Sequence, residues 1–380
     1  MSRPVRLLVV VAIAAGLIAL AVALTGGDER ARRPATASPP PADFIGLIPP
    51  GLASLNSGEL ARALDDAKRL HAGLVRQTFD WSVIEPRPRH YDFAQYDALM
   101  EAAAPRGIRV LPVLFNPPGF HSSGPPRPSP RGTFPPRRPA DMGAFAAVVA
   151  RRYGPGGSFW RAHPGLPADP IRSWQVWNEP SLPVYWPTGP SPRAYARLLA
   201  ATARAIRAVD PRAAIVSAGI PQSRIGVPFG RYVEGLYRAG AQSSFDVLAI
   251  HPYARDAAGV VAAIAQARRI MDRHGDHSPI WVTEVGWASA GPASDFTVGP
   301  RGQADRVRTT LLALGEQRRR LNLRGLVYFG LRDSPVYAGG RDFWGLHTGL
   351  QTVGGRTKPA FAAFENSASR VLGRYARPSR

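Results

Sequence analysis

The chain has 380 residues, of which 45% are hydrophobic, enough for one β/α-barrel of about 250 residues with insertions or for two smaller domains. It contains no cysteine, which excludes disulfides, thiolate metal sites, a cysteine nucleophile and a lipid-modified cysteine anchor. The net charge of +21 comes almost entirely from arginine, since Lys68 and Lys358 are the only lysines.

This positive charge leaves two interpretations open. One is attraction to an acidic polysaccharide, an anionic membrane or a nucleic acid. The other is a base composition that places arginine wherever it is tolerated. The arginines are scattered along the chain and no nucleic-acid motif accompanies them. We therefore expect no nucleic-acid partner.

The N-terminal segment predicts export. Arg3 and Arg6 precede an apolar run at 7–24 that is just long enough to cross a bilayer. Residues 1–24 are thus predicted to be a membrane anchor or a signal segment, and Ala21-Val22-Ala23 provides a possible cleavage site. Residues 25–42 are charged and then rich in proline and alanine, as in a linker. We expect an extracytoplasmic protein, either membrane-anchored or secreted.

From Asp43 to about residue 375, short β-rich runs alternate with helical patterns. The eight predicted strands are Phe44–Ile48, Leu74–Thr78, Ile108–Leu114, Ser173–Trp177, Ala214–Ala218, Phe245–Ile250, Ile280–Thr283 and Gly325–Phe329. A proline-crowded loop at 117–139 interrupts the rhythm after the third strand. Ser191-Pro192 opens the helix after the fourth strand in the favoured order of cap and first residue.

Eight alternations in one direction predict parallel pairing and a closed (β/α)8 TIM barrel. The alternative is an open doubly wound sheet. That fold usually carries a glycine-rich first turn, and this sequence has none. We expect the barrel to be a monomer.

Two glutamates end two of the predicted strands. Glu179 follows the fourth strand in Trp177-Asn178-Glu179-Pro180, and Glu284 ends the seventh strand. Catalytic residues of such barrels lie at the carboxyl ends of the strands, so both carboxyls face one mouth. Two carboxyls at one mouth are typical of glycoside hydrolysis, in which one donates a proton to the leaving oxygen. The other attacks the anomeric carbon or activates a water molecule, and the sequence alone cannot tell which.

These motifs resemble clan A glycoside hydrolases, retaining β/α-barrel enzymes, and most of all family 39 or the cellulase-like family 5. The Trp-Asn-Glu-Pro run is similar to the clan's acid/base motif, and Trp281-Val282-Thr283-Glu284 is similar to its nucleophile strand. The resemblance implies that Glu179 is the acid/base and Glu284 the nucleophile. It extends from Asp43 to about residue 370.

The resemblance also implies a set of substrate-binding residues: Arg76, Asn178, His251, Tyr253, Trp287 and Trp344. Arg76 matches the clan's strand-two arginine beneath the nucleophile, while His251 and Tyr253 match its strand-six pair. Trp287 is a candidate for stacking on a sugar ring. Many clan members carry tryptophan at the end of strand eight, where this chain has Phe329. Either Trp344 in the following loop replaces that platform, or the sugar subsite differs from that of the clan.

We therefore predict a retaining glycosidase that acts on an oligo- or polysaccharide with a β-linkage. No cluster of histidines and acids shows metal-ligand spacing, so neither a metal nor another cofactor is expected. Two alternatives remain open: a transglycosylase in cell-surface glycan assembly, and a catalytically inactive barrel that binds polysaccharide. The sequence does not distinguish endo from exo action, nor does it name the sugar.

Overall fold

A computed structural model of the chain describes residues 39–51, 55–125, 132–336 and 340–373. The predicted anchor at 1–24 and nearly all of the predicted linker lie outside these ranges. Within them, no helix is long and apolar enough to cross a membrane. The compact unit begins at Pro40.

Nine parallel strands form one sheet in the order β5-β4-β3-β2-β1-β9-β8-β7-β6. The fifth barrel strand is broken into two short pieces, so the predicted strands six, seven and eight are β7, β8 and β9. The strands are β1 (Ile45–Leu47), β2 (Leu74–Asp80), β3 (Arg109–Phe115), β4 (Ser173–Val176), β5 (Ala214–Val216), β6 (Ile220–Pro221), β7 (Leu248–His251), β8 (Ile280–Val285) and β9 (Leu323–Tyr328).

The broken fifth strand closes the ring. Its first piece, β5, pairs with β4, and its second piece, β6, pairs with β7. Single bridges join Val216 to Val247 and Asn178 to Gly219 across the break. The predicted TIM barrel is therefore confirmed, and the open doubly wound sheet is wrong.

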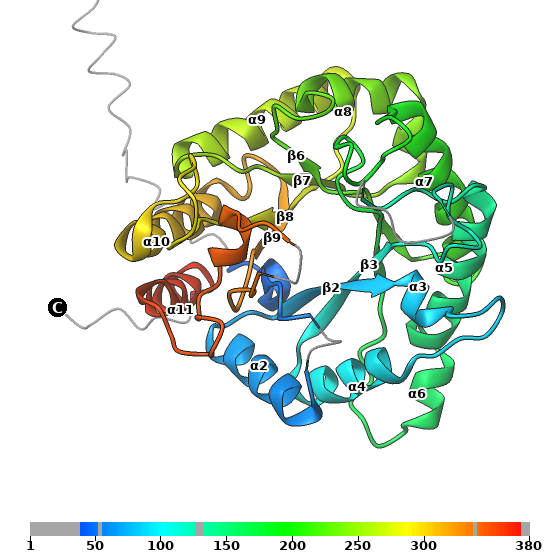
Figure 1. The fold of residues 1–380 in the computed structure, drawn as a ribbon, viewed down its shortest axis with the longest axis horizontal. Coiled ribbons are helices and arrows are strands. Elements are labelled where there is room, and N and C mark those ends of the chain that lie inside the picture. Colours follow the sequence, from blue (N-terminus) through cyan, green and yellow to red (C-terminus); the bar gives the residue numbers. More distant parts are fainter. Residues whose placement is uncertain (1–38, 52–54, 126–131, 337–339, 374–380) are drawn as a thin grey trace, which may run out of the picture. The chain divides into compact units, whose positions relative to one another are not determined.

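Helices surround the ring of strands (Figure 1). They are α2 (Ser57–Arg69), α3 (Trp81–Ile84), α4 (Ala94–Ala103), α5 (Pro139–Tyr153), α6 (Ser158–Ala162), α7 (Pro192–Arg207), α8 (Phe229–Arg238), α9 (Ala257–Arg273), α10 (Gly299–Gln317) and α11 (Pro359–Val371). As predicted, α7 begins after a Ser191 cap, whose hydroxyl accepts from the Ala194 amide.

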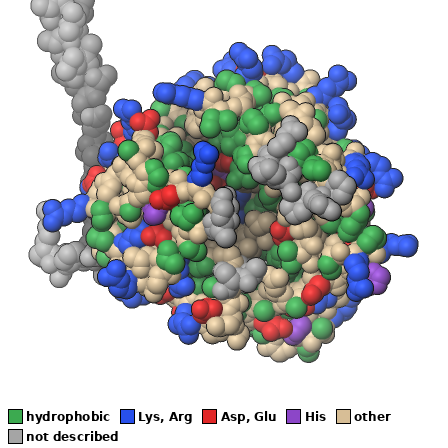
Figure 2. All heavy atoms as spheres, viewed as in Figure 1, with side chains coloured by type: hydrophobic (Ala, Val, Ile, Leu, Met, Phe, Trp, Pro, Cys, Tyr) green, Lys and Arg blue, Asp and Glu red, His purple; other side chains and the backbone are tan. Residues whose placement is uncertain are grey.

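Two layers of apolar side chains hold the barrel together. The larger one packs the helices against the strands, and a smaller cluster fills the barrel's interior. The interior cluster comprises Leu74, Leu111, Val216, Val247, Ala249, Trp281 and Val327. A packed interior leaves the strand ends as the place where polar side chains can gather. Figure 2 shows that the face viewed in Figure 1 is hollowed at its centre.

Candidate active site

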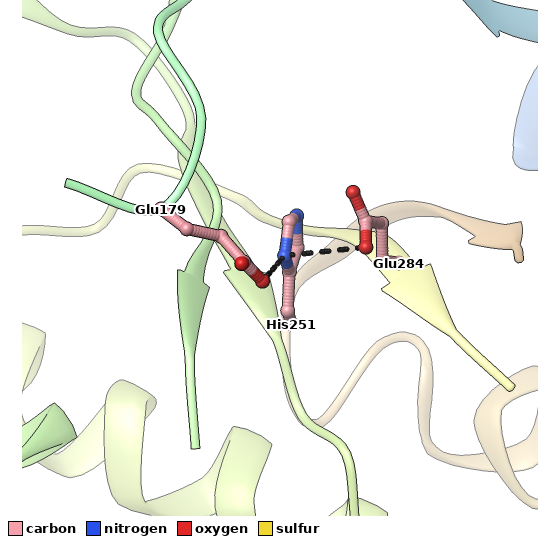
Figure 3. Close-up of side chains that lie close together, drawn as sticks. All are labelled: Glu179, His251 and Glu284. Atoms are coloured by element: carbon pink, nitrogen blue, oxygen red, sulfur yellow. Dashed lines mark hydrogen bonds and ion pairs between the residues drawn. The ribbon is translucent and has the colours of Figure 1, made fainter. Parts of the chain in front are cut away.

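Glu179 and Glu284 lie across the mouth of the barrel from each other, as their strand-end positions predict. Glu179 follows β4, and Glu284 lies near the end of β8. His251, the last residue of β7, lies between them (Figure 3). One carboxylate oxygen of Glu179 lies within 4.8 Å of one oxygen of Glu284. The two side chains are 11% and 12% exposed, so they are largely shielded while still reaching the surface.

The backbone before Glu179 turns sharply out of the strand. Trp177 has a φ of 73° and Glu179 a φ of 43°, both in the left-handed region. Each such residue costs about 1–3 kcal/mol unless its surroundings compensate. Here the Trp177 indole donates to the Tyr185 carbonyl and the Glu179 amide donates to the Gly219 carbonyl. The loop after β4 is thereby held in a conformation that brings Glu179 over the ring.

Arg76 on β2 is the cation beneath the predicted nucleophile. Its Nη1 donates to Glu284 Oε1 at 2.7 Å, Nη2 to Asn178 Oδ1 at 2.8 Å and Nε to Gln175 Oε1 at 2.7 Å. Because arginine only donates, each of these three oxygens must be an acceptor. Among the described residues, the Asn178 amide nitrogen has no hydrogen-bond acceptor, so it remains available as a donor. Arg76 is 6% exposed at its side chain, so water hardly screens its charge.

Glu284 also accepts a hydrogen bond from a residue that lies just beyond β7. The Tyr253 hydroxyl donates to Glu284 Oε2 at 2.8 Å. Burial acts to raise the pKa of Glu284, but the positive potential of His251 and Arg76, with the hydrogen bonds from Tyr253 and Arg76, outweighs it. The pKa of Glu284 is therefore lowered. Burial, together with the charges of the two glutamates, raises the pKa of Tyr253, which stays a neutral donor.

Among the described residues, Glu179 has a single side-chain hydrogen-bond partner, His251, whose Nδ1 lies 2.6 Å from Glu179 Oε1. Burial is the main cause that raises the pKa of Glu179, and the charge of Glu284 adds to it. The hydrogen bond from His251 and the electrostatic interaction with its ring oppose these two causes without cancelling them. One carboxyl thus favours the protonated form and its neighbour the ionised form, a division that suits an acid beside a nucleophile.

Glu179, His251 and Glu284 also form the one group among the described residues with donor atoms close enough to hold a metal ion. A cation bound there would compete with the Arg76 guanidinium for Glu284 and be repelled by its charge. The hydrogen bonding therefore favours proton transfer at these carboxyls over metal binding.

The two predicted tryptophans differ in their placement. Trp344 is partly exposed, and its ring lies 5.1 Å from that of Tyr253 and 4.6 Å from that of Phe296. It therefore borders the site. Trp287 is 0% exposed, and its indole donates to the Ala254 carbonyl. A ring without exposed surface cannot stack on a sugar, so the structure gives Trp287 a packing role and not the predicted contact.

Four residues of the site escaped the sequence analysis: Gln175, Tyr185, Thr283 and Phe296. Gln175 and Thr283 are fully buried under the carboxylates. Tyr185 and Phe296 come from loops of no regular pattern. Only Gln175 and Thr283 carried a signal, since each is a polar residue within an otherwise apolar strand.

One protein-family model matches part of this chain. Residues 172–334, from β4 to just beyond β9, match the family model described as glycosyl hydrolase catalytic core. The matched region contains Glu179, His251, Tyr253 and Glu284. A search of curated proteins found no match.

Solved structures share the fold at low sequence identity. A family 39 glycoside hydrolase from Bacteroides cellulosilyticus WH2 has a TM-score of 0.60 at 17% identity, covering 87% of this chain and 64% of that one. The exo-β-1,4-mannosidase Op5Man5 from Opitutaceae bacterium strain TAV5 has 0.59 at 21%, covering 88% and 60%. A GH5_18 protein from Streptomyces cattleya in complex with GlcNAc has 0.61 at 18%, covering 90% and 82%.

The chain thus spans less than two thirds of the first two of these proteins. The predicted resemblance to clan A glycoside hydrolases is confirmed. The solved structures share the fold, and the family model matches the part of the chain that contains both glutamates.

Proposed function

We propose that the chain is a retaining glycoside hydrolase that cleaves a β-linked glycan by double displacement. The observation that carries this proposal is the unequal surroundings of two neighbouring carboxyls. Glu284 receives hydrogen bonds from Arg76 and Tyr253, whereas Glu179 is held by His251 alone among the described residues. The separation of their nearest oxygens, within 4.8 Å, supports the short spacing of retaining enzymes, about 5–5.5 Å between carboxyl groups.

In the first step, an oxygen of Glu284 attacks the anomeric carbon while Glu179 gives its proton to the leaving glycosidic oxygen. The product of this step is a glycosyl ester on Glu284. In the second step, Glu179, now ionised, takes a proton from water, and the water oxygen displaces Glu284 from the anomeric carbon. Two displacements at the same carbon return its original configuration.

The β-linkage rests on similarity and not on a bound sugar. One structural neighbour is named an exo-β-1,4-mannosidase. The free amide nitrogen of Asn178 and the rings of Trp344 and Tyr185 give the mouth one donor and two aromatic surfaces for a sugar ring. We infer an oligo- or polysaccharide substrate from these features.

The pH dependence follows from the two pKa shifts. Glu284 must be ionised to attack, and because its pKa is lowered, activity should fall only below the ordinary glutamate value of 4.5. Glu179 must be protonated in the first step, and because its pKa is raised, activity should persist above 4.5 and fall on the alkaline side. The profile of kcat/KM against pH should therefore be bell-shaped.

The test is hydrolysis of a panel of aryl glycosides and polysaccharides, followed by NMR of the first-formed anomer. Retained configuration is expected, and an inverted first product would defeat the mechanism. Arg76→Ala should reduce kcat/KM by about 10²-fold or more, because Glu284 loses its buried cation. Arg109→Ala, which removes an arginine at the opposite end of the barrel, is the matched control and should leave kcat/KM within about two-fold.

The same panel separates the two alternatives. A transglycosylase would make a new glycoside when an acceptor sugar is added and would hydrolyse slowly without one. An inactive polysaccharide-binding barrel would bind polymers and turn over none of the aryl glycosides.

We also propose that the chain is exported and held at a membrane by residues 7–24. A shortened protein lacking residues 1–38 should be fully active and should no longer fractionate with membranes. Mature protein recovered from the medium with its N-terminus at Leu24 would replace the anchor with a signal peptide.

A further inference from the structure

A buried row of polar side chains joins the two halves of the site. Gln175 on β4 and Thr283 on β8 are both 0% exposed and lie beneath the carboxylates. Gln175 Oε1 accepts from Arg76 Nε at 2.7 Å. At the other end of the row, Thr283 Oγ1 lies 3.1 Å from His251 Nε2. The row therefore links Arg76, which binds the proposed nucleophile, to His251, which binds the proposed acid/base.

The direction of each hydrogen bond in this row follows from Arg76. A guanidinium has no acceptor, so the Gln175 amide must turn its oxygen toward Arg76. Its Nε2 then faces the Ser217 carbonyl at 3.2 Å and Thr283 Oγ1 at 3.4 Å, and it donates to both. Thr283 Oγ1 is thereby an acceptor from Gln175, and its own hydrogen is directed to another group.

That group is His251 Nε2. Among the hydrogen bonds of the described residues, the Thr283 hydroxyl has no other acceptor, and a buried hydroxyl without an acceptor is costly. If Thr283 donates to Nε2, this nitrogen carries no hydrogen. The ring hydrogen is then on Nδ1, which donates to Glu179 Oε1 at 2.6 Å.

We propose that Gln175 and Thr283 are positioning residues that hold His251 as a neutral ring with its hydrogen on Nδ1. His251 then occupies one oxygen of Glu179 as an acceptor and leaves the other oxygen to carry the transferable proton. The hydrogen also faces Glu284 Oε2, which is 3.6 Å from Nδ1. The consequence for catalysis rests on the proposed function; the tautomer itself does not.

The tautomer can be read directly in the full-length protein labelled with ¹⁵N-histidine. A long-range ¹H–¹⁵N spectrum distinguishes a protonated Nδ1 with a bare Nε2 from the reverse and from the doubly protonated ring. The chain has eight histidines, and a His251→Gln variant assigns the signal. We expect the Nδ1-protonated pattern. The doubly protonated pattern at neutral pH, or a bare Nδ1, would overturn the proposal.

Three variants then test the row itself. Thr283→Ser keeps the hydroxyl and should keep the pattern, with kcat within about three-fold. Thr283→Val removes the donor and should shift the Nε2 signal and lower kcat by about ten-fold or more. Gln175→Glu offers acceptors only, so Thr283 would donate to it, and Nε2 of His251 should become protonated.

The titratable groups close to His251 are Glu179, Glu284 and Tyr253, and the charge of Arg76 acts on Glu179. If the tautomer of His251 changes, its hydrogen bond to Glu179 changes too. The alkaline limb of the kcat/KM profile against pH should therefore move in Thr283→Val and not in Thr283→Ser. Unchanged ¹⁵N shifts in Thr283→Val would sink the proposal even if activity fell. If no glycoside is hydrolysed at all, the proposed function fails, but the wild-type spectrum still decides the tautomer.

A second, independent observation concerns the outer surface beside the mouth. The three exposed positions of α7 are all arginine: Arg193, Arg197 and Arg204. Spacings of four and seven residues place them on one side of the helix. The helix contains no acidic residue. Of the helices with ten or more residues that the structure describes, α7 alone lacks one.

A groove adjoins the first half of this stripe. Its cavity measures about 390 Å³ and is lined by Arg137 and Arg197, with Trp186 and the hydroxyls of Ser123 and Thr188. No acidic residue lines the cavity, and neither arginine has an ion pair among the described residues. Trp186 packs edge-on against Trp177, two residues before Glu179. The groove thus lies beside the loop that carries the acid/base.

We propose that this arginine face, formed by Arg137, Arg193, Arg197 and Arg204 with the adjoining groove, binds an anionic polysaccharide. This deepens the proposed function, on which it rests, because the bound polymer would be the distal part of an acidic substrate. Unpaired cations beside hydroxyls suit carboxylate-bearing sugars. A membrane would need exposed apolar side chains between the arginines, and α7 presents none at these positions.

The test is affinity electrophoresis of the full-length protein in gels that contain polygalacturonate, a neutral glucan or no polymer. We expect retardation by polygalacturonate alone, with Kd rising about ten-fold or more in Arg137→Ala/Arg193→Ala/Arg197→Ala. The matched control removes the same charge from the other side of the barrel, near α10 and α11 (Figure 1), through Arg301→Ala/Arg319→Ala/Arg370→Ala. The control should change Kd by less than about two-fold.

Equal losses in both triple variants would show that net charge alone is responsible and would overturn the arginine face. Tighter binding to duplex DNA or to anionic vesicles than to polygalacturonate would overturn it as well. Retardation is measured without turnover, so this result does not depend on whether the protein hydrolyses a glycan.

Discussion

The two ends of the barrel both bury carboxylates against arginine, but in opposite proportions. At the base, Asp43 accepts hydrogen bonds from Arg324 at 2.6 Å and from Arg109 at 2.9 Å. One acid is therefore shared by two cations there. At the mouth, one cation, Arg76, lies beneath two acids that lie within 4.8 Å of each other.

The ratio of arginines to carboxylates affects the pKa of the carboxyls at each end of the barrel. Burial acts to raise the pKa of Asp43, but the hydrogen bonds and charges of Arg324 and Arg109 outweigh it and the pKa is lowered. That acid stays ionised and fixes the segment just before β1 to β9 and β3. At the mouth, Arg76 donates a hydrogen bond to Glu284 and not to Glu179. Burial and the charge of Glu284 therefore keep the pKa of Glu179 raised, and this carboxyl can carry the proton. A shortage of positive charge at one end provides the acid that the chemistry needs.

The largest effect should come from removing the nucleophile. Glu284→Gly should lower kcat/KM by at least about 10⁴-fold, because no other group can form the glycosyl ester. Azide entering the space should restore turnover and give a glycosyl azide of inverted configuration, measured by NMR. The barrel should stay folded, because Arg76 keeps its bonds to Gln175 and Asn178.

Removing the acid/base should cost less. Glu179→Ala should lower kcat/KM by about 10²–10⁴-fold on substrates with poor leaving groups, and far less in the first step on activated aryl glycosides, which need little protonation. Azide should then give a product of retained configuration, since the ester on Glu284 still forms. A retained azide product from Glu284→Gly together with an inverted one from Glu179→Ala would mean that the roles of the two glutamates are reversed.

Some of this contrast could be predicted from the sequence. The strand-end glutamates, Arg76, His251 and Tyr253 follow from the alternation of elements and from motifs, because a parallel barrel brings the carboxyl ends of all strands together. The broken fifth strand could not be predicted, since Gly219 marks it only through a close contact with His251. Trp287 was misplaced because a tryptophan after a strand can face either the mouth or the helices, and only packing decides which.

Alanine substitutions at two glycines, one at the mouth and one at the base, test the contrast between the two ends of the barrel. Their expected effects are smaller than those of removing a catalytic glutamate. A Cβ on Gly219 would come within 1.9 Å of His251 Nε2, whereas a Cβ on Gly325 at the base would come within 2.7 Å of the Phe44 carbonyl and 3.1 Å of the Trp281 indole nitrogen. Gly219→Ala should therefore displace His251 and lower kcat/KM by about 10²-fold. Gly325→Ala should cost about 1–3 kcal/mol of unfolding free energy and leave kcat/KM nearly unchanged.

Kinetics and urea denaturation of both variants provide the measurement. The contrast between the two ends would be lost if Gly325→Ala reduced activity as strongly as Gly219→Ala in a protein that is still folded.

The smallest effect concerns Asp43 and its pH dependence. Asp43→Asn should lower the unfolding free energy by about 1–3 kcal/mol at pH 7, less than for a fully buried pair, because the Arg109 side chain is 56% exposed. A lowered folded-state pKa means that Asp43 stabilises the fold at pH values above its ordinary 3.8 and that this contribution disappears as the pH falls through the folded-state value.

The difference between wild type and Asp43→Asn should therefore be constant from pH 7 to about pH 5 and shrink below about pH 4. Urea denaturation at several pH values measures it. Asp65→Asn is the matched control, because the Asp65 side chain is 62% exposed in its pair with Arg106, and it should cause no measurable change. Both variants should keep wild-type kcat/KM, since neither residue reaches the mouth. A loss of activity in Asp43→Asn without a loss of stability would contradict the assignment of stability to the base and chemistry to the mouth.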